Sequence, residues 1–289
     1  MLFNFLLNGL VNGSLIAVVA LGFALVYNTT RIFHIAYAGL YALGGYLMFW
    51  FLETIGFSFL LSIVLTLGLV SFASLLIEYL VYKPLSLRNR PHSTLMISSI
   101  GIFILLVNAI LLFFGPNPWI LRPDILTMPE MRVGNLSSLP LLSFVSNLAV
   151  ILAFILLLKF TRLGITIRAL RDNAMISSVF GVNTYRVRLL LFALSGFMVA
   201  LAASFRALDV GINPQIGLPV FINAFVALVI GGIGRFEGPV IGAFILGILQ
   251  SLASYFIDSQ WVVLVTFTIL VLFILYKPEG LVPERQRAY

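Results

Sequence analysis

Cysteine is absent from the 289-residue sequence, and histidine occurs only twice. Without thiols there is no disulfide, thiolate metal site or cysteine nucleophile, and cysteine usage says nothing about the redox compartment. Charged residues make up only 9% of the chain, against about a quarter in an ordinary soluble domain. The chain therefore lacks the side chains from which most hydrolytic and metal centres are built. We expect no catalytic residues, no metal and no cofactor.

Motifs for phosphate binding and hydrolysis are absent as well. The sequence has no G-x-x-x-x-G-K-[ST] loop, no G-x-S-x-G elbow and no H-E-x-x-H pair. The stretch GGIGRFEG at 231–238 superficially matches a dinucleotide fingerprint, but it lies between two apolar segments and not after a strand. It predicts instead a flexible turn leading into a closely packed helix. The residues of this turn and packing surface are Gly231, Gly232, Gly234, Gly238, Pro239 and Gly242.

Apolar residues, in contrast, make up 61% of the chain. Runs near the roughly 20 residues that cross a bilayer lie at about 3–27, 57–80, 94–114, 141–159 and 187–207. Shorter runs, which could be tilted spans, broken helices or re-entrant pieces, lie at about 36–52, 219–232, 239–257 and 261–276. This pattern predicts an all-α polytopic membrane protein with eight or nine transmembrane helices, forming one transmembrane domain over residues 1–289.

Basic residues are distributed unevenly between alternate connections if all nine segments cross. All but three of the 17 Lys and Arg residues fall in one set of connections, and only Arg122, Arg132 and Arg206 fall in the other. By the positive-inside rule the basic set is cytoplasmic, which places the N-terminus outside and the C-terminus inside. The same rule accounts for the net charge of +7 without a nucleic-acid partner. The outer connection, at about 115–140, is rich in proline, which favours turns and extended pieces.

Polar side chains inside apolar segments are costly and are functional candidates. Asn4, Asn8 and Asn12 recur every four residues and share one face of the first helix. Gly9 and Gly13 form a small-xxx-small pair on a neighbouring face. The asparagine face could pack against another helix or line a solute path, and both interpretations remain open.

A polar break follows the first span, where His34 and Tyr37 precede a glycine-rich helix start. Transporters often bind solutes at such breaks, because irregular backbone is tolerated only where it lines a cavity or protein interior. A plain interfacial turn has the same pattern. Asn223 is isolated in a later apolar run, where helix packing also explains it. The candidate residues for a substrate pathway are Asn8, Asn12, His34, Tyr37 and Asn223.

Charge is concentrated in the connection at about 160–186. Its apolar residues are spaced by four, three and four, which places them on one helix face: Leu163, Ile167, Leu170 and Ala174. Arg168 and Asp172 are four apart and can pair, Gly181 suits a helix C-terminal cap, and Asn183 suits an N-cap. We predict a short amphipathic helix, a tight turn and a new transmembrane helix. Periodicity alone leaves open whether the short helix meets lipid or a cytoplasmic protein.

The sequence at 162–196, RLGITIRALRDNAMISSVFGVNTYRVRLLLFALSG, resembles the cytoplasmic loop of permease subunits in bacterial ATP-binding cassette importers for branched-chain amino acids, the LivH-like group. The stretches at 6–27 and 212–252, and YKPEGLVPE at 276–284, resemble the same family in the same order. This resemblance implies a permease subunit of the inner membrane without enzymatic activity of its own. Its implied partners are a second related permease subunit, two cytoplasmic ATPase subunits and a periplasmic substrate-binding protein.

The resemblance also implies which residues receive the work of the ATPase. The implied coupling helix and turn comprise Arg168, Ala169, Arg171, Asp172, Asn173, Ala174, Gly181 and Asn183. Relatives usually read Asn-x-Ala-x-Gly-[Asp/Glu] after the first span, whereas this chain reads HIAYAG at 34–39. The departure keeps urea and short amides open as solutes beside branched-chain amino acids. A stand-alone channel or ion-coupled carrier would need embedded carboxylates, and Glu78 is the clearest acid near a helix interior.

Overall fold

The structure is a computed structural model that describes residues 2–88, 90–120, 136–257 and 261–282. Across these ranges the chain is helical, and the only β-type pairing is an isolated antiparallel bridge between Trp119 and Ile212. Most of the expected outer connection, with Arg122 and Arg132, lies outside the described residues. The bridge ties the start of that connection to the end of a later helix, so residues far apart in sequence meet at one end of the bundle.

The helices follow the predicted apolar runs closely. They are α1 (Leu2–Thr30), α2 (Ala36–Phe49), η1 (Trp50–Thr54), α3 (Phe59–Ile77), η2 (Glu78–Tyr82), α4 (Lys83–Leu87), α5 (His92–Phe114), α6 (Ser138–Phe160), α7 (Arg162–Asp172), α8 (Ala174–Val179), α9 (Thr184–Val210), α10 (Gly217–Gly231), α11 (Gly238–Phe256) and α12 (Val262–Tyr276). The segments η1 and η2 are π-helical turns continuous with the helices that precede them, a feature common at functional sites.

Six helices of the described chain are long and apolar enough to cross a membrane. They are Phe3–Thr30, Phe59–Leu87, His92–Phe114, Ser138–Phe160, Thr184–Val210 and Gly238–Phe256. This set contains all five of the long predicted runs and adds one of the four shorter ones. The remaining short runs form α2, α10 and α12, of 14, 15 and 15 residues. The prediction of an all-α chain with several helices of membrane-spanning length is therefore confirmed for the described residues.

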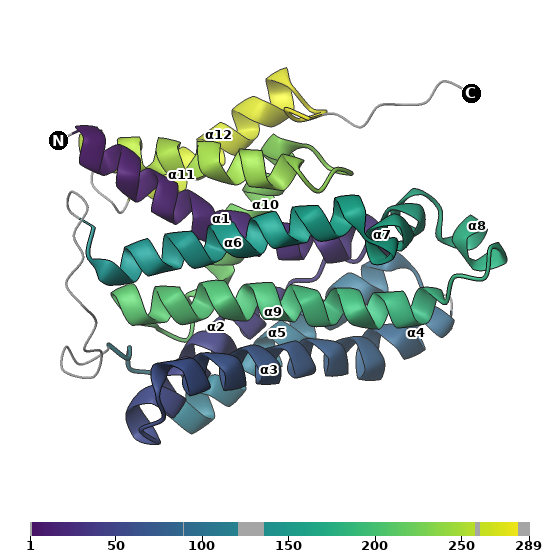
Figure 1. Ribbon diagram of the computed structural model, residues 1–289, viewed down its shortest axis with the longest axis horizontal. Helices are drawn as coiled ribbons and strands as arrows, with labels where there is room; N and C mark the ends of the chain where they lie inside the picture. Colours follow the sequence, from purple (N-terminus) through teal and green to yellow (C-terminus); the bar gives the residue numbers. More distant parts are fainter. Residues whose placement is uncertain (1, 89, 121–135, 258–260, 283–289) are drawn as a thin grey trace.

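The core is centred on α1 and α2. The 18-residue apolar window of α1 is 89% buried, against 17% for α5 and 22% for the span beginning with α3. Twelve of the 14 residues of α2 are also buried. Figure 1 shows the longer helices running side by side, with the N-terminal end of α1 at one end of the bundle and α4, α7 and α8 at the other. Outer helices such as α5 present apolar side chains to the surroundings, as lipid contact requires.

Glycines allow α1 and α11 to pack closely. A Cβ added to Gly9 would lie 3.0 Å from Ile248 Cα, and one added to Gly13 would lie 3.1 Å from Phe244 Cα. On α11, Gly247 lies against the backbone of Gly13. The predicted small-xxx-small face is thus confirmed as a helix-packing surface, in which missing side chains allow the backbones to approach.

Candidate functional site

The charged segment forms two helices, where the sequence predicts one. Asn173 has extended backbone, ends α7, and caps α8 by accepting a hydrogen bond from Ile176 N at 3.0 Å. Gly181 then turns the chain with φ of +81°, and the Asn183 side chain accepts from Arg186 N at 3.1 Å at the start of α9. The turn at Gly181 and the cap at Asn183 thus lie at the positions that the sequence predicts. The break at Asn173 was missed because its side chain caps a second helix.

The predicted apolar stripe on this segment is only partly buried. Ile167 and Leu170 are buried against the bundle, whereas Leu163 is 45% exposed and Ala174 lies on the exposed α8. Gly164 extends the buried face, because it packs against the backbone of Leu158 where a side chain would not fit. The prediction of one continuous stripe to Ala174 is therefore wrong, since the chain changes direction at Asn173.

Arg168 and Arg171 attach α7 to the membrane bundle. The Arg168 guanidinium donates to the carbonyl of Leu158 at the end of α6, and Arg171 Nη1 donates to Gly234 O at 2.8 Å. Arg171 also forms an ion pair with the adjacent Asp172, at 2.6 Å. The sequence suggested that Arg168 pairs with Asp172; in the structure Asp172 pairs with Arg171 instead. These bonds direct both arginines toward the bundle, and the partly buried Ala169 lies between them.

The glycine-rich turn after α10 joins three segments that are distant in sequence. Besides the bond from Arg171, its Gly234 N donates to Asn28 Oδ1 at the end of α1, at 3.2 Å. The C-terminal segment is also bound here, since Leu281 N donates to Ile230 O and Val282 N to Gly231 O. Gly232 and Gly234 of this turn have φ of +104° and +107°, values that glycine adopts readily.

The glycine and proline residues after this turn begin α11. Gly238 lies against the backbone of Gly231, and Gly242 lies against Ala227 O of α10. Pro239 occupies the first turn of α11, where its missing N–H costs no hydrogen bond. The start of α11 thus packs closely against the end of α10.

In contrast to α7, α8 presents an apolar surface away from the bundle. Four large apolar side chains are 54–83% exposed on α8 and the turn after it: Met175, Ile176, Val179 and Phe180. Figure 1 shows α8 projecting beyond the ends of the long helices. Contiguous exposed apolar surface commonly marks an interaction site. We call these four residues the apolar tip of the segment.

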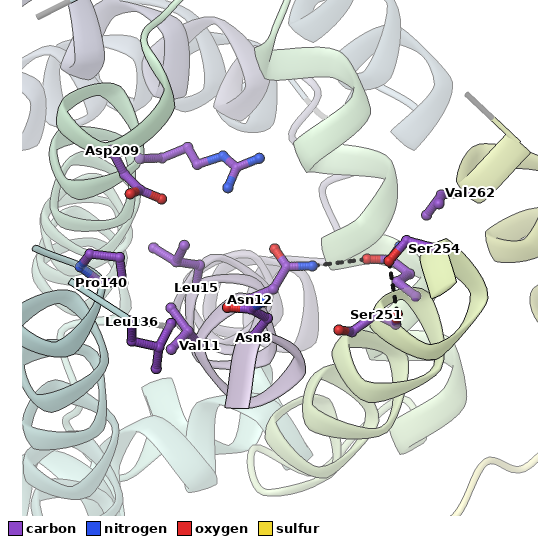
Figure 2. Close-up of a pocket in the computed structure, with 12 residues that line it drawn as sticks. Asn8, Val11, Asn12, Leu15, Leu136, Pro140, Asp209, Ser251, Ser254 and Val262 are labelled. Atoms are coloured by element: carbon purple, nitrogen blue, oxygen red, sulfur yellow. Dashed lines mark hydrogen bonds between the residues drawn. The ribbon is translucent and has the colours of Figure 1, made fainter. Parts of the chain in front are cut away.

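A polar cavity of about 300 Å³ lies near the opposite end of the bundle. Its polar lining comes from α1, α9 and α11: Asn8, Asn12, Arg206, Asp209, Gln250, Ser251 and Ser254. Figure 2 shows Asn8 and Asn12 on one side of the cavity and Ser251 and Ser254 on another. Seven of its twelve lining residues are thus polar, in a chain that is 61% hydrophobic. The cavity is large enough for a small polar solute.

Gln250 connects the cavity to the interior. It accepts from Asn12 Nδ2 at 3.2 Å and donates through Nε2 to Asn223 Oδ1 at 3.1 Å and Thr266 Oγ1 at 2.7 Å. Three of the five predicted pathway residues, Asn8, Asn12 and Asn223, thus belong to one polar region. Gln250, Arg206 and Asp209 were missed, although each is a polar residue at or within an apolar run and could have been found by that criterion.

His34 and Tyr37 lie elsewhere, in a second buried region. His34 Nδ1 is 2.8 Å from the hydroxyl of Tyr82 in η2, and the Tyr37 hydroxyl donates to Val19 O at 3.2 Å. Both side chains are fully buried and neither lines the polar cavity. The structure therefore separates the five predicted pathway residues into two groups.

Glu78, the candidate membrane carboxylate, lies in η2, the π-helical turn that also contains Tyr82. Its side chain is completely buried, and its Oε1 lies 2.8 Å from Arg188 Nη2 of α9. The neighbouring Lys83 lies instead over the rings of Tyr79 and Tyr185, at 4.8 Å and 4.0 Å from their centroids. Glu78 is thus part of an ion pair between two spans. No group of three or more metal-ligating side chains occurs among the described residues.

Spans of this length around a buried helical core define a multi-pass membrane protein. Comparison with known families shows to which family of membrane proteins the chain belongs. Residues 5–275 match the family described as "Branched-chain amino acid transport system / permease component". The chain belongs to this family of transport components. The resemblance drawn from the sequence is therefore confirmed.

Individual relatives match over nearly the whole chain. The high-affinity branched-chain amino acid transport system permease protein LivH of Salmonella typhimurium is 29% identical, over 97% of this chain and 96% of LivH. The corresponding protein BraD of Pseudomonas aeruginosa is 30% identical, over 98% and 96%. Among solved structures, PsaBC from Streptococcus pneumoniae in complex with Fab is similar, with a TM-score of 0.54 and 13% identity over 95% of this chain and 92% of that chain. This last match supports the fold alone.

Proposed function

We propose that this chain is the transmembrane permease subunit of an ATP-binding cassette importer in a bacterial inner membrane. It moves branched-chain amino acids, or a related small polar solute, with ATP hydrolysed by two cytoplasmic partner subunits. A second, related permease and a periplasmic binding protein complete the assembly. Residues 1–289 form one permease domain, crossed eight or nine times, with the N-terminus outside. Family membership supports this proposal, and so does the absence of a phosphate-binding loop from the sequence.

The apolar tip is the single feature that carries the coupling proposal. Its four side chains project from the end of the bundle that the basic residues assign to the cytoplasm. Since Arg168 and Arg171 are bonded to the bundle, α7 is positioned to transmit a movement of α8 to α6 and the glycine-rich turn. Docking therefore occurs mainly through α8, and α7 acts as the connection to the membrane helices.

Co-purification tests the docking surface. We expect the double variant Val179→Asp with Phe180→Asp to lose the ATPase subunit, because charged side chains would have to be buried in the interface. The folded permease should keep its thermal stability, since these side chains are 80% and 83% exposed. Leu87→Asp is the control, because Leu87 is 74% exposed at the same end of the bundle but outside the segment. Retention of the ATPase by the double variant would refute docking at α8.

The polar cavity is proposed as the outer part of the solute path. Its amides and hydroxyls can exchange hydrogen bonds with a polar solute during dehydration, which lowers the cost of leaving water. Uptake by the complete transporter in proteoliposomes, with labelled leucine, urea and acetamide compared, identifies the solute. Asn8→Leu should reduce uptake of that solute with little loss of stability. Uptake without any ATPase subunit would instead indicate a carrier.

Orientation can be measured directly, because the natural chain has no cysteine. A single cysteine at Ser178 should react with a membrane-impermeant maleimide only after the cytoplasmic side is exposed. A cysteine at Ser137, at the start of α6, should react in intact spheroplasts. The reverse pattern would overturn the proposed orientation.

A further inference from the structure

A second cavity, of about 540 Å³, lies between the end of α6, α7 and the glycine-rich turn. Four basic side chains and one acidic side chain line it: Lys159, Arg168, Arg171, Arg235 and Glu237. The coupling and solute proposals do not use this space. Several cations in a hollow with low-dielectric walls create a positive potential that attracts an anion.

Two of these cations are held in place by the protein. Arg168 donates to Leu158 O, and Arg171 donates to Gly234 O at 2.8 Å. These bonds come from α6 and from the glycine-rich turn, the two other walls of the cavity. Lys159 and Arg235 complete the positive lining from those same walls. The charges are thus gathered by the fold itself, which lowers the cost of ordering them around a ligand.

The surface beside the cavity indicates what kind of anion it receives. Along α6, Leu152, Leu156 and Phe160 are spaced by four and are 52%, 53% and 73% exposed. The adjacent face of the same helix carries Ile155 and Lys159, which line the cavity. An exposed apolar stripe on a helix of membrane-spanning length, ending at a basic hollow, is complementary to a lipid with an anionic headgroup.

We propose that this basic cavity binds the phosphate headgroup of an acidic phospholipid, with the acyl chains along the exposed stripe of α6. The lipid belongs to the leaflet on the α7 side of the membrane. Bound there, its phosphate contacts residues from α6, α7 and the glycine-rich turn together, and it therefore stabilises the position of α7. The assignment rests on these contacts and does not require that the chain couples to an ATPase.

Ligand titration of the purified full-length chain in neutral detergent tests the site. Thermal unfolding is followed with dioctanoyl phosphatidylglycerol, dioctanoyl phosphatidylcholine or inorganic phosphate. We expect saturable stabilisation by phosphatidylglycerol at concentrations where the other two have no effect. Equal protection by inorganic phosphate would show a site for free anions, and equal protection by phosphatidylcholine would show purely apolar binding. Either result would overturn the lipid assignment.

The charged lining is tested with Lys159→Gln combined with Arg235→Gln, which leaves Arg168 and Arg171 of α7 unchanged. Each basic residue near an acidic headgroup contributes about 1 kcal/mol, so the double variant should bind phosphatidylglycerol about 30-fold more weakly. Arg90→Gln with Lys277→Gln makes the same charge change at exposed positions outside the cavity and should bind normally. Equal weakening in both double variants would refute a specific site. Unchanged lipid binding in the cavity variant, with loss of the ATPase subunit from the complex, would assign the cavity to a protein partner.

Discussion

The buried ion pair between Glu78 and Arg188 predicts an asymmetric response to removing either partner. Glu78 is fully buried, whereas the Arg188 side chain is 21% exposed and its guanidinium also lies 3.3 Å from the Ser86 hydroxyl. Arg188→Met leaves a carboxylate inside the protein without its cation. Glu78→Gln leaves an arginine that still reaches solvent and a hydroxyl acceptor. The first variant should therefore be the more damaging.

Typical values give the size of the difference. Removing one partner of a buried pair costs about 3–5 kcal/mol when the remaining charge is stranded. Loss of a hydrogen bond to a charge that stays solvated costs about 1.5–3 kcal/mol. The double variant Glu78→Gln with Arg188→Met strands no charge, so it should be more stable than Arg188→Met alone, with a coupling energy of at least about 1 kcal/mol.

Thermal unfolding of the purified chain in detergent measures these differences. At about 2 °C for each kcal/mol in a chain of this size, Arg188→Met should lower Tm by about 6 °C or more. Arg186→Met is the matched control, because Arg186 is exposed one half-turn away on the same helix, and it should leave Tm nearly unchanged. If Glu78→Gln is as damaging as Arg188→Met, or if the double variant is no better than Arg188→Met, burial of the carboxylate does not determine the stability of this pair.

Three further predictions concern packing and polar contacts. Gly247→Val should lower stability by about 1–3 kcal/mol because of overpacking against Gly13. Gly68→Val, whose side chain would meet open space, should not lower it, and thermal unfolding compares the two variants. Gln250→Leu should lower the free energy of unfolding by about 1–3 kcal/mol for each partner it leaves without a hydrogen bond. Ser254→Ala, which loses only a bond to its own helix, should lower it less, and equal losses of stability would contradict the proposed amide network. Gly280→Val should release the C-terminal segment, since Gly280 has φ of +75° and packs against Gly232. Faster hydrogen exchange at the amides of Leu281 and Val282, which donate to Ile230 O and Gly231 O, would report this release, with Gly101→Val as the unaffected control.

Local features set by sequence spacing were predictable. The apolar runs predicted where the helices lie. Gly181 and Asn183 predicted a turn and a helix cap, and Gly9 with Gly13 predicted a helix-packing face. Each of these depends on residues close together in the chain. Spacing of three and four also suggested the pair of Arg168 with Asp172, but tertiary acceptors on α6 and the glycine-rich turn engage the arginines instead.

Features that depend on contacts between distant segments could not be read from periodicity. Arg188 was assigned to a cytoplasmic connection, yet it pairs with Glu78 inside the bundle. Gln250 stands out in sequence as a polar residue within an apolar run, but its hydrogen-bond partners Asn12, Asn223 and Thr266 come together only in the fold. His34 and Asn12 were placed in one candidate pathway, although His34 is buried beside Tyr82 and Asn12 lines the polar cavity. In each case the deciding partner lies more than 100 residues away or on another helix, so the fold itself had to supply it.

The bonds that hold residues 280–282 also have a consequence for biosynthesis. These residues are translated after Ile230 and Gly231, to whose carbonyl groups they donate hydrogen bonds. Arg171 of α7 is bound to the same glycine-rich turn, at Gly234. During synthesis the glycine-rich turn therefore remains without one of its supports until the ribosome has nearly finished the described chain. A chain shortened before Gly280 would insert its spans but leave this turn incomplete. The surface where α7 meets the bundle is therefore among the last parts of the described chain to be completed.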